Sequence, residues 1–241
     1  MCLATLSRGC RKLNGTDKRN GIDESVGFES GLLQNVNLSH RAREEKPFPA
    51  AMAFDRLNIS RNNISYVDRD AFEDLHELRI LDLSSNSIDE LSGGTFRTLE
   101  FLKYLNLGFN RLYKIHRNSF DGNGKLETLL LNDNFLSFDD NMLELPASVM
   151  YLNLINNNIR QLPFLNKTLD RLVVLDLNGN NLSTITNESF HNFRRLVILN
   201  LRNSSLVSVK EHAFVYNSLL EEVRLDGNQL NLDLGIEYIR A

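Results

Sequence analysis

The sequence predicts an α/β solenoid, in which successive coils stack and a parallel β-sheet lines the concave side. Three observations predict this fold. The pattern L-x-x-L-x-L-x-x-N-x-L, clearest from Leu78 to Ile88, recurs in eight copies between Phe54 and Leu230. The copies follow one another at steps of 23 or 24 residues, and a fixed period of this size is typical of solenoids. Within each copy, apolar and polar residues alternate, which indicates a short strand.

One strand of this length cannot bury its leucines alone. Stacking it on the same strand of the next copy forms a parallel sheet and a continuous apolar core. The convex side is expected to be irregular, 3-10 helical or made of short helices. A phenylalanine recurs there, and we expect these rings to form an aromatic column in the core: Phe72, Phe96, Phe120, Phe190 and Phe214.

An asparagine closes almost every copy where the chain turns out of the strand. Its amide both donates and accepts hydrogen bonds, so it can satisfy backbone groups at the bend between coils. The predicted structural ladder consists of Asn62, Asn86, Asn110, Asn134, Asn157, Asn180 and Asn228. Ser204 holds this position in the seventh copy and can do only part of that work, so we expect looser packing there.

These repeats, with a small residue before the phenylalanine as in Ala71-Phe72 and Thr95-Phe96, resemble the leucine-rich repeat family. The 24-residue form is similar to the typical subclass found in extracellular Toll receptors, slit and chaoptin. The resemblance covers residues 54 to 230 and implies a curved, right-handed coil that binds other macromolecules without catalysis. Because members bind very different ligands, it does not name the ligand. Secreted members usually carry disulfide-rich caps, whereas this chain has only Cys2 and Cys10.

The pattern divides the chain into three parts. Residues 1–32 are polar and mixed in charge, and we expect a poorly ordered lead. Residues 33–53 are interpreted as a degenerate zeroth repeat, because Arg41 stands where the asparagine belongs. Residues 54–241 form the predicted solenoid of eight repeats. Its C-terminal end lacks a convincing polar cap, so we expect a fragment of a longer repeat protein, truncated at the C-terminus.

Composition and motifs argue against several classes of function. The net charge of −4 argues against a nucleic-acid surface. No apolar run reaches the roughly 18 residues of a membrane-spanning helix, and the N-terminus does not have the pattern of a signal peptide. The five histidines are scattered, and no nucleophile elbow or phosphate loop is present. We therefore expect no catalytic, metal or cofactor site and predict that the chain is not an enzyme.

Asparagines in N-x-S/T sequons are more frequent than composition alone predicts. This excess favours a secreted or cell-surface glycoprotein. The candidate glycosylation sites are Asn14, Asn37, Asn58, Asn63, Asn166, Asn181, Asn187 and Asn203.

A partner is expected to bind the concave face, which is lined by the strand residues between the leucines. An apolar and aromatic patch with a polar rim is typical of a binding interface. The predicted central patch consists of Ile80, Tyr104, Phe109, Leu130, Tyr151, Ile155, Val174 and Ile198. Its rim holds Asp82, Asp133, Asp176, Arg202 and Arg224. Tyr104 and Tyr151 are the expected anchors; the alternative interpretation is that apolar β-formers occupy strands merely because they favour them.

Three functions are compatible with these observations. The first is part of the ectodomain of a cell-surface receptor or secreted glycoprotein, which binds a protein ligand or co-receptor and is anchored to the membrane through a part not present here. The second is a cytoplasmic scaffold or adaptor that uses the same face. The third is the recognition part of an enzyme, such as a kinase, whose catalytic domain would lie beyond Ala241. In each case a preorganised sheet presents side chains at fixed spacing and needs no cofactor.

Overall fold

The computed structural model describes residues 55–137, 143–161 and 169–231. The predicted lead of residues 1–32 and the predicted zeroth repeat of residues 33–53 lie outside this part of the chain. The same holds for the expected continuation of the solenoid beyond Asn231.

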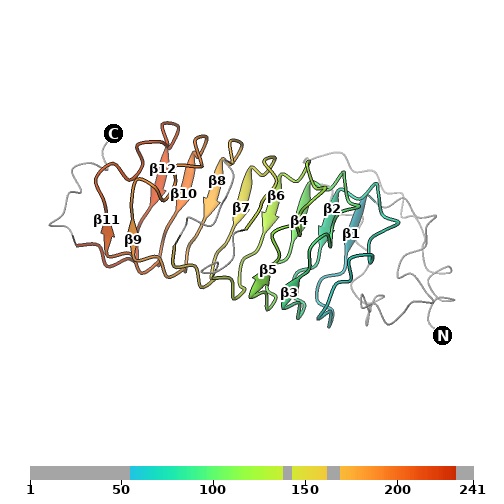
Figure 1. Ribbon diagram of the computed structural model, residues 1–241. Coiled ribbons are helices and arrows are strands. Elements are labelled where there is room, and N and C mark those ends of the chain that lie inside the picture. The colour runs from blue at the N-terminus through green and yellow to red at the C-terminus, as the bar shows by residue number, and fades with distance from the viewer. Residues whose placement is uncertain (1–54, 138–142, 162–168, 232–241) are drawn as a thin grey trace, which may run out of the picture.

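One parallel sheet of eight strands runs the length of the molecule (Figure 1). Its strands pair in chain order, each in register with the equivalent residues of the next repeat. They are β1 (Arg56–Asn58), β2 (Ile80–Asp82), β4 (Tyr104–Asn106), β6 (Thr128–Leu130), β7 (Tyr151–Asn153), β8 (Val174–Asp176), β10 (Ile198–Asn200) and β12 (Glu222–Arg224). The predicted solenoid is thereby confirmed, and each repeat contributes one strand to the main sheet.

Burial alternates along each strand as the sequence pattern predicts. The middle residue points into the core, and in β2, β4 and β6 these are the fully buried Leu81, Leu105 and Leu129. The residues on either side of it are half-buried and face outward, because successive side chains of a strand point to opposite faces. This outward face of the sheet is the concave face of the sequence analysis.

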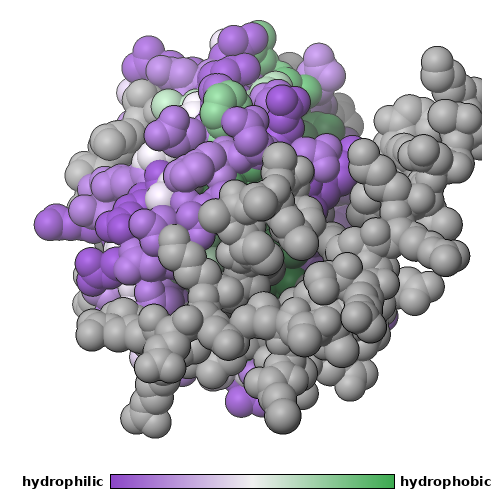
Figure 2. Space-filling view, turned by 90° about the vertical axis from the view of Figure 1, so that its right-hand side faces the viewer, coloured by the Kyte–Doolittle hydropathy of each residue, from purple (hydrophilic) through white to green (hydrophobic). Residues whose placement is uncertain are grey.

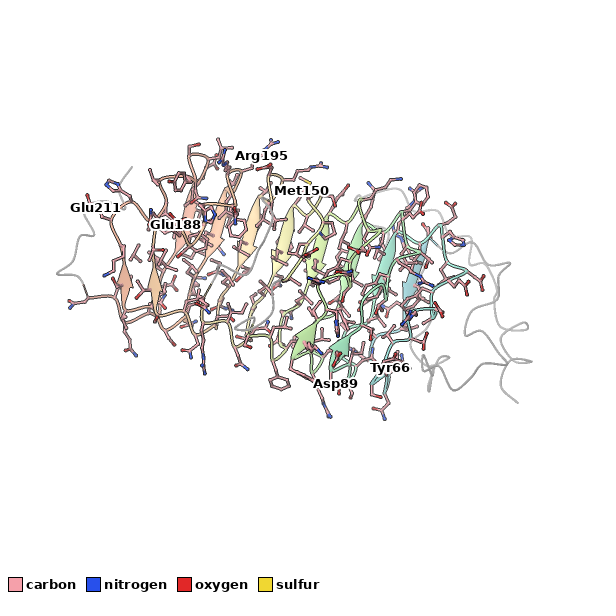
Figure 3. The ribbon with its side chains drawn as sticks, viewed as in Figure 1. Tyr66, Asp89, Met150, Glu188, Arg195 and Glu211 are labelled. Atoms are coloured by element: carbon pink, nitrogen blue, oxygen red, sulfur yellow. The ribbon has the colours of Figure 1, made fainter. Side chains whose placement is uncertain are left out.

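Two short strand pairs lie beside the main sheet, at the edge where its strands end. β3 (Glu90–Leu91) pairs with β5 (Lys114–Ile115), and β9 (Thr184–Ile185) pairs with β11 (Ser208–Val209). Figure 3 shows Tyr66 and Asp89 along this lower edge, whereas Met150 and Arg195 lie along the upper edge, where the chain approaches the strands. The solenoid therefore has two distinct borders beside its concave face.

The convex side of the described residues consists of turns without a helix. From each recurring phenylalanine to the next strand the chain makes two consecutive three-residue turns, as in Leu75 N to Phe72 O (3.0 Å) and Leu78 N to Leu75 O (3.1 Å). This spacing brings every third side chain to the core. The end of the solenoid that carries β1 presents a mostly hydrophilic described surface (Figure 2).

The recurring phenylalanines stack in two groups. Ring centroids are 6.0 Å apart between Phe72 and Phe96 and 6.1 Å apart between Phe96 and Phe120. A second stack joins Phe190 to Phe214 at 5.9 Å. The fourth and fifth repeats, which lack this phenylalanine, separate the two groups, so the predicted column is interrupted where the repeats are one residue shorter.

Candidate functional site

Two rows of outward side chains cross the sheet, and the pairing register places the residues of each row side by side. The first face row precedes the buried middle residue of each strand. It consists of Arg56, Ile80, Tyr104, Thr128, Tyr151, Val174, Ile198 and Glu222. The second face row follows that residue. It consists of Asn58, Asp82, Asn106, Leu130, Asn153, Asp176, Asn200 and Arg224.

The structure brings the predicted central patch onto one surface, and none of its members is fully buried. Five of them belong to the first face row, and Leu130 belongs to the second. Ile155 and Phe109 follow their strands by two and three residues. Most are half-buried, whereas the Phe109 side chain is 58% exposed. These apolar side chains thus form part of the solvent-facing surface.

The second face row has a structural role that its sequence pattern does not reveal. Asp82 Oδ1 accepts a hydrogen bond from the Ser84 amide at 2.8 Å, and Asn106 Oδ1 accepts one from the Gly108 amide at 3.0 Å. Equivalent bonds are made by Asn58, Asn153, Asp176 and Asn200. Each closes a local turn after the strand. One oxygen of each of these side chains is therefore occupied, and Asn200 Nδ2 also donates to Asp176 Oδ2 at 3.0 Å.

A third row follows each strand by three residues and has a positive φ in every repeat. We call it the turn row: Arg61, Ser85, Phe109, Asp133, Asn156, Gly179, Asn203 and Gly227. A left-handed backbone suits Gly and Asn, but it is unfavourable for a bulky side chain. Phe109, at φ 55°, is the least expected member. Sequence reasoning missed this row because its residue types differ so widely.

Tyr104 and Tyr151 stand on either side of Thr128 in the first face row. Burial raises the pKa of Tyr104 above its ordinary value, and the charges of Asp82 and then of Tyr151 add to the rise. Burial also raises the pKa of Tyr151, and the charge of Asp176 adds to it. The two carboxylates belong to the second face row, on the strands next to the two tyrosines.

Charges are distributed unevenly over the concave face. At its C-terminal end Arg202 Nε lies 2.6 Å from Asp226 Oδ1, and Arg224 Nε lies 2.6 Å from Glu222 Oε1. The basic residues of the predicted rim are thus neutralised within the chain. In the middle of the face, Asp82, Asp133 and Asp176 accept amide hydrogen bonds, but within the described ranges none of them forms an ion pair.

The asparagine ladder lies beneath this surface and holds adjacent coils together. Asn110 Nδ2 donates to Leu83 O and Leu107 O, both at 3.0 Å, and Asn110 Oδ1 accepts from the Ile88 amide at 3.1 Å. The same set recurs at Asn86, Asn134, Asn157, Asn180 and Asn228. Asn62, in the first described repeat, donates to Ile59 O within its own coil.

Ser204 reproduces only the donating half of this arrangement. Its hydroxyl donates to Leu177 O at 2.9 Å and to Arg202 O at 3.0 Å. In the other repeats the asparagine oxygen also accepts a hydrogen bond from an amide of the preceding repeat, as Asn110 does from Ile88. The equivalent amide before Ser204 is that of Leu182. The serine hydroxyl does not accept from it, and within the described ranges the Leu182 amide has no other backbone acceptor.

The structure describes five of the eight candidate glycosylation sites, and all five are exposed: Asn58, Asn63, Asn181, Asn187 and Asn203. Asn58 lies in the second face row and Asn203 in the turn row, at opposite ends of the concave face. Asn14, Asn37 and Asn166 lie outside the described residues.

The described part of the chain holds no cluster of three or more His, Cys, Asp or Glu side chains with the geometry of a metal site. Within the same ranges we find no helical segment with the length and apolarity needed to cross a membrane.

A leucine-rich repeat family model matches residues 54–112, 76–136 and 170–230. Osteomodulin from Bos taurus is 30% identical over 220 residues, which cover 88% of this chain and 44% of osteomodulin. Keratocan from Mus musculus is 24% identical, covering 89% of this chain and 66% of keratocan. Epiphycan from Gallus gallus is 30% identical over 51% of this chain and 48% of epiphycan. This chain thus spans less than half the length of osteomodulin.

Solved structures show the same fold. The leucine-rich repeat domain of APL1 matches with a TM-score of 0.60 and 26% identity, covering 70% of this chain and 42% of that one. The equivalent domain of APL1B matches with a TM-score of 0.61 and 24% identity, covering 72% and 48%. Since the family model matches more than half of the residues, the chain belongs to the leucine-rich repeat family.

Proposed function

We propose that this chain is the ligand-recognition part of an extracellular protein, a cell-surface receptor or a secreted glycoprotein, and that it binds a protein through its concave face. Two general findings support this function. Osteomodulin, keratocan and epiphycan are extracellular matrix proteins, which supports an extracellular location. Leucine-rich repeat domains bind proteins, and these relatives are non-enzymatic structural or binding proteins. The 24-residue subclass and membrane anchoring stay predictions.

The observation that carries the proposal is the outward position of the central patch. Tyr104, Tyr151 and their aliphatic neighbours in the first face row are accessible to solvent. The core lies behind the sheet, so these apolar side chains do not contribute to it. An apolar and aromatic surface rimmed by polar groups is typical of interfaces. Tyrosine supplies contact area at low entropic cost and is enriched among residues that dominate binding energy.

Phe109 gives independent support. Its backbone is in the left-handed region, where a bulky residue costs roughly 1 kcal/mol or more. Its ring is more than half exposed and so contributes little burial free energy to the core. A strained backbone that does not help to stabilise the fold is a reason to suspect function. Tyr113 and Phe135, in the same and the next repeat, are likewise exposed, each at 56%.

The distribution of sequons supports the same location. No N-x-S/T sequon occurs between Asn63 and Asn166. This interval contains the second, third and fourth repeats, which include Ile80, Tyr104 and Phe109. Glycans attached at the flanking sites would leave the middle of the face open to a partner, while those at Asn58 and Asn203 would limit binding at its two ends.

The test combines glycan mapping with binding. Mass spectrometry of the native protein is expected to find glycan on Asn63 or Asn181, whereas an intracellular adaptor would carry none. Purified extracellular proteins from the same organism are then screened against the chain by biolayer interferometry. For a partner found in this way, Tyr104→Ala with Tyr151→Ala is expected to weaken binding at least about tenfold, as loss of two central aromatic anchors does.

The matched control is Tyr66→Ala with Tyr216→Ala, which removes two exposed tyrosines outside the concave face. It is expected to leave the dissociation constant unchanged. Equal effects of the two double variants, or binding that survives loss of Tyr104 and Tyr151, would rule out the concave face as the binding surface.

A further inference from the structure

The convex turn of the seventh repeat carries exposed apolar side chains. Hydrogen bonds from Asn217 N to Phe214 O (2.9 Å) and from Leu220 N to Asn217 O (3.0 Å) shape this turn. Asn217 is buried, and Phe214 and Leu220 pack against the core. The residues between them face outward, and three of these are apolar and exposed. We call them the convex patch: Val215 (57%), Tyr216 (47%) and Leu219 (50%).

The exposure of this patch does not come from its place near the end of the described solenoid. The first repeat holds Glu73 and Glu77 at the positions that Val215 and Leu219 hold in the seventh. Both glutamates are exposed although the coil of the second repeat follows them. These positions therefore face solvent rather than the next coil. The seventh repeat thus presents apolar groups where the first presents charged ones.

Charged residues of opposite sign stand on two sides of the convex patch. Arg195 holds the position of Leu219 one coil earlier, and Glu211 lies four residues before Val215. Both are exposed, and Figure 3 shows Arg195 at the upper edge and Glu211 at the C-terminal end. Within the described ranges Arg195 forms no ion pair. The one ion pair of Glu211 there joins its Oε1 to His212 Nε2 at 3.3 Å.

This arrangement of charges makes the surface complementary to itself. A twofold axis through the middle of the convex patch brings Arg195 of one copy toward Glu211 of the other, because the two residues flank the patch on opposite sides. The apolar side chains of the two copies then meet at the axis. A partner with a single sign of charge would instead be repelled at one of the two sides.

We propose that the convex patch is a dimer interface, in which a second copy of this chain packs the same three side chains against it and each Arg195 lies beside Glu211 of the other copy. A twofold contact through one self-complementary patch is the commonest form of oligomer. Three apolar side chains make a small interface, of the transient class below about 1,200 Å². We therefore expect a dissociation constant of roughly 10 to 100 µM. The concave faces take no part, so the dimer presents two of them.

Sedimentation equilibrium of the full chain, from about 1 to 200 µM, tests the dimer. The mass is expected to rise to that of two chains and no further, because a twofold contact closes on itself. Val215→Glu with Leu219→Glu should weaken the dimer at least about tenfold, because it places like charges in the interface. The matched control, Phe135→Glu with Val207→Glu, changes two exposed apolar residues outside the patch and should alter the dissociation constant less than about twofold.

A charge exchange tests the pairing of the two copies. Arg195→Glu and Glu211→Arg, each alone, are expected to weaken the dimer about tenfold, because like charges then face one another. An equimolar mixture of the two variants should recover the affinity of the unchanged chain, since each new glutamate faces a new arginine. Misfolding of a variant would not produce this recovery.

The proposal is overturned if the chain stays monomeric over this range, if its mass grows beyond that of a dimer, or if the mixture associates no better than its components. Its failure differs from failure of the proposed function. A monomeric chain that binds a protein ligand, and loses it with Tyr104→Ala and Tyr151→Ala, would retain the proposed function without the dimer.

Discussion

Two asparagines four residues apart, at the end of the same strand, have opposite roles. Asn110 is almost fully buried, and its side chain makes hydrogen bonds to two coils. Asn106 is half-buried on the concave face, and its Oδ1 accepts a hydrogen bond from the Gly108 amide, two residues ahead. The same residue type thus joins coils in one row and lies on the solvent-facing sheet surface in the other. Burial, rather than residue type, distinguishes the two roles.

The two rows also differ in how much their residue type varies between repeats. The asparagine ladder is asparagine in seven repeats and serine in one, because several backbone groups depend on a side chain that both donates and accepts. The second face row includes Asn, Asp, Leu and Arg. Its local turn needs only an acceptor and survives without one, as at Leu130. The residue types of the second face row can therefore change without loss of the fold, while the asparagine ladder holds the coils together.

The largest expected effect on stability comes from removing a side chain of the asparagine ladder. Asn110→Ala should lower the free energy of unfolding by about 3 kcal/mol, because it leaves Leu83 O, Leu107 O and the Ile88 amide buried without partners. Urea denaturation followed by circular dichroism measures the loss. Asn106→Ala is the matched control and should cost less than about 1 kcal/mol. Similar losses in the two variants would contradict the distinction between the rows.

A smaller gain in stability is expected at Ser204, the one position where the ladder lacks an asparagine. Ser204→Asn should raise the free energy of unfolding by about 1 kcal/mol, because the new carboxamide oxygen supplies the acceptor that the Leu182 amide lacks. Amide hydrogen exchange of Leu182 should slow in the same variant. Destabilisation instead would mean that the site has closed around the smaller serine.

The smallest expected effect is on the pKa of Tyr104, which lies on the concave face. The folded pKa of Tyr104 is raised above 10.0, first by burial and then by Asp82. Its neutral form therefore stabilises the fold below pH about 10, and this stabilisation is lost as the pH rises through the folded pKa. Asp82→Asn should lower the pKa of Tyr104 toward 10.0, and NMR titration of the ring signal, assigned with Tyr104→Phe, measures it.

Asp176→Asn provides the control for this titration. It should lower the pKa of Tyr151, because Asp176 contributes to the shift at that residue. The pKa of Tyr104 should change less than that of Tyr151, because Asp176 reaches Tyr104 only through the charge of Tyr151. A Tyr104 pKa that does not respond to Asp82→Asn would contradict the proximity of the two side chains.

The sequence alone was enough to predict the repeat register and the strand positions. Leu81, Leu105 and Leu129 recur at a fixed step, and a period of this kind leaves one way to stack the coils. The outward position of Tyr104 and Tyr151 followed from alternation along the strand. The turns that use Asp82 and Asn106 were not predicted, because an Asx residue in a strand pattern is compatible with a free side chain.

The sequence by itself therefore determined the family, the parallel sheet and the face on which each strand residue lies, because all of these depend on local periodicity. Only the tertiary structure decided which side chains meet across that face. Tyr104, Thr128 and Tyr151 are 23 or 24 residues apart along the chain, and stacking places them on adjacent strands. The position of Asp82 near Tyr104 and the pairing of Arg202 with Asp226 depend on side-chain orientation between coils, which no local pattern encodes.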